Sequence, residues 1–190
     1  MNSIQTFRSF VLPLLLLSAG IACRNPAQKQ DSKDVAEDKN DIKFDNKDQE
    51  KNASFTVDAV AGFNDMIQLS ELAAQKSANA GVKQVAAALK EEYTGLLGRF
   101  KAWGAKNNIS LPAEATKQAR EDAAMLAALP PRRFDKQWCE LMMEKHKKMI
   151  GQYESAAAGL TADSLREIVT AVLPPVRTQY DKLMQYHHKL

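Results

Sequence analysis

Along the chain from residue 54 to residue 190, apolar side chains recur every three or four positions, and charged or polar side chains fill the positions between them. This spacing is typical of amphipathic α-helices, because it places the apolar side chains on one face. No stretch alternates apolar and polar residues as a half-buried strand would. The pattern therefore predicts an all-α domain, with helices near residues 55–79, 82–106, 113–129, 134–158 and 161–187.

The breaks between these helices set the expected topology. Residues 79–81 separate the first two helices, and Pro130-Pro131 separates the short third helix from the fourth. Four long helices with one long connection favour a ferritin-like four-helix bundle, with a short extra helix in the crossover between the second and third long helices. We expect Pro174-Pro175 to kink the last helix, since proline removes a backbone donor and clashes with the preceding turn.

The first 23 residues have the three-part layout of a secretory signal. One positive charge, Arg8, precedes an apolar run over residues 11–17, and small residues lead up to Cys23. The apolar run is too short to span a membrane, which needs about 20 residues. Residues 1–22 are therefore predicted to be a signal peptide. The small Ala22 before Cys23 resembles a bacterial lipobox, and this resemblance implies that Cys23 becomes a lipidated N-terminus after cleavage.

A lipid on Cys23 implies a location in the bacterial cell envelope, with the membrane as one partner. We expect the outer membrane, with the domain facing the periplasm. The alternative is a soluble exported protein that the ordinary signal peptidase cleaves after Ala22. The formal net charge of +3, without a basic stripe that carries interleaved aromatic residues, argues against a nucleic-acid partner.

The segment after the cysteine differs in composition from the rest of the chain. Residues 24–53 mix acidic and basic side chains, and their sizeable apolar residues are only Val35, Ile42 and Phe44. Such a segment buries too little apolar area to offset the loss of chain entropy. We therefore predict a lipidated cysteine and disordered charged tether over residues 23–53, followed by the helical domain over residues 54–190.

Short motifs within the domain occur in an informative order and spacing. They are Leu69–Ala73, Val82–Tyr93, Leu111-Pro112, Phe134-Asp135, Met142–His146 and Leu173-Pro174. Together they resemble a bacterial family of envelope-directed, ferritin-like helical bundles, defined as a domain of unknown function and often labelled as outer-membrane proteins. The resemblance covers about residues 55–190. It implies an envelope location and a ferritin-like fold.

The same resemblance implies where inner polar residues should lie. Members of the family commonly carry a glutamate on the inner face of the first long helix and histidines on the other three. The matching positions here are Met66, Tyr93, His146 and Gln179, and only His146 keeps the residue type. If the family's residues bind a metal, the resemblance implies that this chain has lost most of the set.

His146 is the main candidate for a functional side chain. It lies on the apolar stripe of its helix, between Met142 and Met149. Buried polar groups normally find hydrogen-bond partners. We therefore expect an inner polar cluster in which His146 bonds to Tyr93, Gln179 or a carboxylate.

The alternative role for His146 is as a metal ligand. A di-metal site in a helical bundle needs inward carboxylates and Glu-x-x-His pairs. Met143 stands three residues before His146, and no Glu-x-x-His pair occurs. The remaining candidate ligands are Glu71, Glu92 and Glu154, each of which fits a solvent-exposed edge equally well. We therefore expect neither a metal nor another cofactor.

Three further reactive side chains fit structural roles. Cys139 follows Trp138 on a helix face that leans toward the core and has no evident base beside it, so a buried thiol is expected rather than a nucleophile. His187 and His188 fall near the end of the last helix, where positive charge is favourable.

These patterns favour a protein without catalytic activity. The sequence contains no phosphate-binding loop, nucleophile elbow or dinucleotide fingerprint. We expect an envelope lipoprotein whose helical domain binds a protein or cell-wall partner. The alternative is a ferritin-like metal-binding or redox protein of the periplasm.

Overall fold

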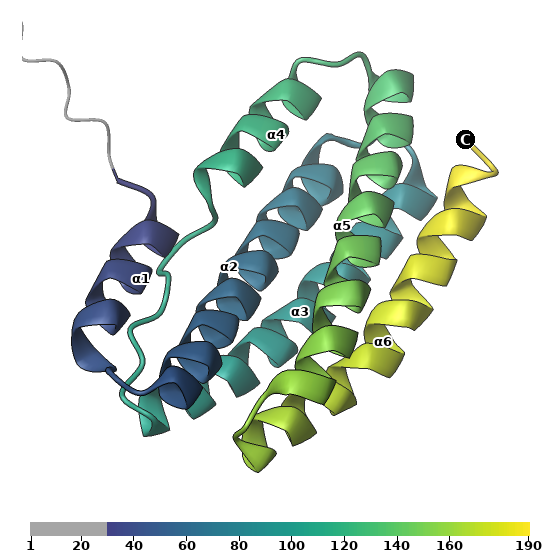
Figure 1. The fold of residues 1–190 in the computed structure, drawn as a ribbon. Helices are drawn as coiled ribbons and strands as arrows, with labels where there is room; N and C mark the ends of the chain where they lie inside the picture. Colours follow the sequence, from purple (N-terminus) through teal and green to yellow (C-terminus); the bar gives the residue numbers. More distant parts are fainter. Residues whose placement is uncertain (1–29) are drawn as a thin grey trace, which may run out of the picture.

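A computed structural model of the chain describes residues 30–190 and folds them into six helices without a strand (Figure 1). The helices are α1 (Ser32–Lys43), α2 (Lys47–Lys76), α3 (Ala80–Lys106), α4 (Lys117–Ala127), α5 (Pro131–Gly159) and α6 (Asp163–His187). The predicted all-α class is confirmed. The signal peptide over residues 1–22 and the lipidation site Cys23 lie outside the described residues. Among the helices described, none combines the length and the apolar character needed to cross a membrane.

The four long helices are arranged as two antiparallel hairpins, α2 with α3 and α5 with α6 (Figure 1). The hairpins meet where α2 faces α5 and α3 faces α6, and these contacts are sparser than those within each hairpin. The connection between α3 and α5 carries α4, which packs against both α2 and α5. Thus α4 lies where the sequence predicts a short extra helix, although it is shorter than the predicted 113–129.

The first helices of the two hairpins begin in different ways. The Oδ1 atom of Asn46 accepts a hydrogen bond from the backbone N–H of Asp48 at 2.9 Å and starts α2. The prediction that this helix begins near residue 55 is therefore wrong by more than two turns. Helix α5 has no side-chain cap and instead begins with Pro131, whose missing N–H would have no helical partner.

The predicted disordered tether is corrected for residues 32–53, which are helical apart from residues 44–46. Helix α1 buries only Ala36 and Asn40. The side chain of Asn40 donates to the backbone oxygen of Ser110 at 2.9 Å and accepts from the backbone N–H of Ser110 at 2.7 Å. Polar bonds to the crossover thus hold α1 in place, and the expectation failed because it counted apolar area alone.

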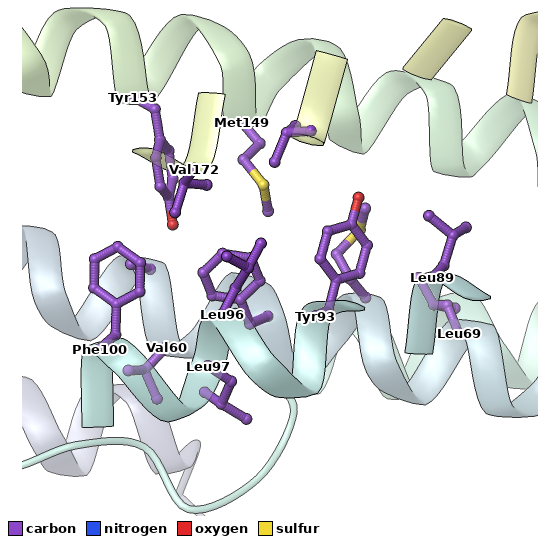
Figure 2. Close-up of a cluster of buried hydrophobic side chains, with 14 of the residues drawn as sticks. Val60, Leu69, Leu89, Tyr93, Leu96, Leu97, Phe100, Met149, Tyr153 and Val172 are labelled. Carbon is purple, nitrogen blue, oxygen red and sulfur yellow. The ribbon is translucent and has the colours of Figure 1, made fainter. Parts of the chain in front are cut away.

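One continuous core lies between the two hairpins, and Figure 2 shows part of it. Its largest fully buried side chains include Trp138, Tyr93, Phe63, Phe100 and Phe134. The indole N–H of Trp138 donates to the backbone oxygen of Leu69 at 2.9 Å, so this buried donor is satisfied. Helix α6 continues through Pro174 and Pro175 as one helix.

Candidate functional site

The structure brings two of the three residues of the expected polar cluster together in the core. Tyr93 on α3 and His146 on α5 are both fully buried. The phenolic hydroxyl of Tyr93 donates to the Nε2 atom of His146. Figure 2 shows Tyr93 with its hydroxyl directed across the core toward α5.

The second nitrogen of His146 also has a partner. Its Nδ1 atom lies 2.6 Å from the backbone oxygen of Met142, one turn earlier in α5. Since a carbonyl can only accept, the proton is assigned to Nδ1, and Nε2 is left to accept from Tyr93. Burial lowers the pKa of His146 to about 4 and raises the pKa of Tyr93 well above its usual value. Both side chains are therefore neutral near pH 7.

Gln179 does not belong to this pair. It is a nearly buried residue of α6, and its amide nitrogen donates to the carboxylate of Glu92 on α3. Glu92 and Tyr93 are adjacent in α3, so their side chains leave the helix in different directions. The expected cluster is thus divided into a sealed Tyr93–His146 pair and a Glu92–Gln179 pair at the edge.

The candidate metal ligands do not converge on His146. Glu71 pairs with Lys90 at 2.9 Å between half-exposed side chains of α2 and α3. Glu154 pairs with Arg177 at the surface between α5 and α6. Over residues 30–190, no group of three histidine, cysteine, aspartate or glutamate side chains is placed to hold a metal ion.

Cys139 and His187 have different surroundings. Cys139 is fully buried, and burial, aided by the nearby Asp135, raises the pKa of its thiol to about 12. The thiol therefore stays protonated near neutral pH and is a weak nucleophile. His187, in the last turn of α6, lies with its Nε2 atom 3.1 Å from the carboxylate of Glu140 on α5, which ties the two helices together.

A groove of about 570 Å³ runs along the seam between α2 and α5. Small residues line it from both sides, with Ala59 and Gly62 on α2 and Gly151 and Ala156 on α5. At Gly151 an added Cβ would meet no atom within 4 Å. The seam is open because these positions lack the side chains that would fill it. The sequence signal that could have revealed it is the presence of glycines inside helices.

The groove has an apolar floor. Tyr153 is 3% exposed, and the half-buried Phe55 packs edge-on against it with ring centroids 5.2 Å apart. The hydroxyl of Tyr153 is buried and has no hydrogen-bond partner among the described residues. Figure 2 shows this side chain directed from α5 into the core, opposite in sense to Tyr93.

Charged side chains border the groove. Lys51 on α2 and Lys148 on α5 are exposed, and neither has an ion-pair partner in the described part of the chain. The acidic Asp58 between them is paired with Lys33 of α1 at 2.7 Å. The border of the groove therefore carries an excess of positive charge.

Beyond Lys148 the groove meets a second cavity of about 290 Å³. There the carboxylate of Asp65 accepts from the backbone N–H of Thr116 at 2.7 Å and from its hydroxyl at 2.9 Å. Burial raises the pKa of Asp65, against the opposing effect of these hydrogen bonds. Because Thr116 caps α4, this contact fixes the start of α4 on α2 and closes that end of the seam.

Comparison with known proteins gives a family and a fold. A family model described as a domain of unknown function, DUF4142, matches residues 38–185. A crystal structure of a DUF305 fragment from Deinococcus radiodurans is similar, with a TM-score of 0.65, 14% sequence identity, and coverage of 73% of this chain and 96% of that chain. At that identity the likeness concerns the fold alone. No curated protein matches the chain.

Proposed function

This chain belongs to the DUF4142 family, a domain of unknown function, and we propose that it is a lipid-anchored envelope protein whose helical domain binds a ligand and does not catalyse a reaction. The groove between α2 and α5 carries the proposal. There an apolar floor, two ammonium groups without an ion-pair partner among residues 30–190, and room for a guest molecule occur together. Such concave, mostly apolar sites with a few polar groups are the usual form of ligand sites.

The state of the reactive side chains supports a non-catalytic role. A general acid or base must reach a proton of its substrate. His146 has no exposed surface, and each of its nitrogens already has a partner. The thiol of Cys139 is buried and protonated. These groups are placed to support the core.

For the architecture we propose a ferritin-like four-helix bundle. Two antiparallel hairpins, joined by a long crossover that carries α4, support this topology (Figure 1). The helix α1 is then an addition that packs on α2 outside the bundle.

The location rests on Cys23. Small residues before it and a secretory layout support a lipid anchor, for which several acyl chains give stable membrane attachment. The test is detergent phase partitioning of the wild type and of Cys23→Ser. We expect the wild type in the detergent phase and the variant in the aqueous phase. Equal partitioning of both into the aqueous phase would contradict the anchor.

The binding role is tested in living cells with a photo-crosslinking amino acid at Gln152, an exposed residue of the groove. The matched control places it at Arg99, an exposed position on α3 away from the groove. We expect an adduct at Gln152 that is absent at Arg99, with its mass measured on the intact protein. Indistinguishable adduct patterns at the two positions would contradict a ligand in the groove.

A metal or redox role is the competing function, and metal analysis separates it from the binding role. Protein purified without added metal should contain no stoichiometric ion, because the candidate ligands are engaged elsewhere. One ion per chain would replace the binding proposal.

A further inference from the structure

We propose that the α2–α5 groove takes a single fatty-acyl chain that ends in a carboxylate. This inference rests on the proposed binding role and adds the chemical class of the ligand. It follows from the shape of the groove, the chemistry of its floor and the charges at its border.

The shape fits one extended chain. On α2 the lining runs from Lys51 to Gly62, which at a rise of about 1.5 Å per residue gives a length of roughly 16 Å. The helix α5 runs antiparallel beside it, and the Lys51 ammonium lies 3.0 Å from the position that a Cβ on Gly159 would take. Helix α4 covers the seam beyond Gly62, so the groove is long, narrow and bounded at that end.

The floor offers contacts for methylene groups and few fixed polar partners. Phe55, Met149, Tyr153 and Leu160 supply aromatic and aliphatic surface. The terminal methyl of Met149 lies 3.8 Å from the position that a Cβ on Gly62 would take, so an unbranched side chain already borders the groove at Gly62. Burying apolar chain against such surface is favourable by about 25 cal/mol per Å².

The charges select the head group. Lys51 and Lys148 stand at opposite ends of the groove without an ion-pair partner in the described residues, whereas Asp58 is already paired with Lys33. An anionic head group at either end meets an ammonium group. A cationic head group meets no unpaired carboxylate among the described residues that line the groove. The electrostatic balance therefore favours an anion over a cation or a neutral head.

The experiment uses the full exported chain carrying Cys23→Ser, purified without detergent, and titrates it with decanoate in a calorimeter. The paired probe is 1-decanol, which has the same chain and no charge. We expect decanoate to bind about tenfold more tightly than 1-decanol, a difference that corresponds to about 1.4 kcal/mol. Raising the salt concentration should reduce this difference, since the lysines are exposed.

Two sets of variants locate the site. Gly151→Leu places a side chain in open groove space and should weaken decanoate binding at least about tenfold. Gly95→Leu is the control, because Gly95 is an exposed α3 glycine with the same free space and lies outside the groove. The double variant Lys51→Gln and Lys148→Gln should lose the preference for decanoate over 1-decanol, and Lys101→Gln with Lys106→Gln should keep it.

Each of the other outcomes would overturn one part of the proposal. Equal affinity for decanoate and 1-decanol would overturn the carboxylate and leave the groove as a binding site. Unchanged decanoate binding by Gly151→Leu would overturn the groove as the acyl site. Absence of binding for both probes would overturn the acyl ligand, while an adduct at Gln152 in cells would still support the proposed binding role.

Discussion

Two tyrosines in the same core have opposite surroundings. Tyr93 lies at the closed end of the α2–α5 seam, where its hydroxyl bonds to His146. Tyr153 lies at the open end, beneath the groove, with a buried hydroxyl that has no partner among the described residues. Figure 2 shows the two side chains pointing in opposite senses across the core.

The sizes of the neighbouring side chains explain the difference. At the closed end Met66 of α2 and Met142 of α5 are both fully buried. At the open end the lining positions include Gly62 and Gly151, and a Cβ added at Gly151 would meet no atom within 4 Å. The closed end therefore contributes to stability, and the open end is available for binding.

The largest expected effect is at the closed end. Replacing His146→Ala opens a cavity and leaves the Tyr93 hydroxyl without its acceptor. Together these should lower the free energy of unfolding by about 4 kcal/mol. Urea denaturation measures this, and His146→Gln should recover part of the loss because its amide can accept the same bond. An alanine variant as stable as the wild type would show that the closed end is not a stabilising centre.

The next effect is a pH dependence that belongs to His146. Its pKa is about 4 in the folded protein and 6.5 when exposed. Its contribution is fully present above pH 6.5 and is lost as the pH falls toward 4, because the unfolded chain takes up the proton first. At about 1.4 kcal/mol per pH unit the loss is about 3 kcal/mol.

The control for this pH dependence is His146→Gln, which keeps a hydrogen-bonding side chain and does not titrate. Asp65, whose pKa is raised by burial, contributes equally to both proteins. Urea midpoints measured from pH 7 to pH 4 should therefore fall more steeply for the wild type. Parallel profiles would show that His146 is not buried as a neutral group.

A smaller effect compares the two tyrosines directly. Tyr93→Phe leaves the Nε2 atom of His146 without a donor and should cost about 1–2 kcal/mol. Tyr153→Phe removes a hydroxyl that has no partner in the described part of the chain, so it should cost nothing or stabilise slightly. Thermal unfolding of both variants checks this. Equal losses would mean that the two ends do not differ.

The smallest effect concerns the free space at the open end. Gly151→Ala should raise the free energy of unfolding by about 0.5–1 kcal/mol, because alanine favours helix and the added Cβ meets nothing. Gly95→Ala on α3 should give the same gain. A loss at Gly151 with a gain at Gly95 would show that the groove is narrower than described.

The helical pattern of the domain could be predicted from the sequence, because apolar residues on a helix face repeat with the helix period. The short α4 and the break at Pro130 follow from the same pattern and from proline, whereas the break predicted at residues 79–81 lies at residues 77–79, because Asn79 caps α3 and Gly81 lies inside it. The helix α1 could not be found in this way, since Asn40 reaches Ser110 across the fold and little of α1 is apolar. Asp31, which caps the start of α1, and Asn46, which caps the start of α2, are residue types that favour helix starts and were visible in the sequence.

For the candidate site, the family resemblance placed Tyr93, His146 and Gln179 at inner positions, helical register agreed for His146, and the structure joins Tyr93 with His146. Register did not separate Gln179, because an inner position near the edge looks the same in sequence as one at the centre. Its bond to Glu92 depends on how far α6 is rotated against α3.

What the sequence alone determined is therefore local. Side-chain periodicity and capping residues specify which segments are helical, because those preferences act within a few residues of each position. Only the tertiary structure decided that Gly62 and Gly151, far apart in the chain, line one groove. The physical reason is that the groove forms where both helices carry small side chains at their contact. The packing of the whole core sets which residues make that contact.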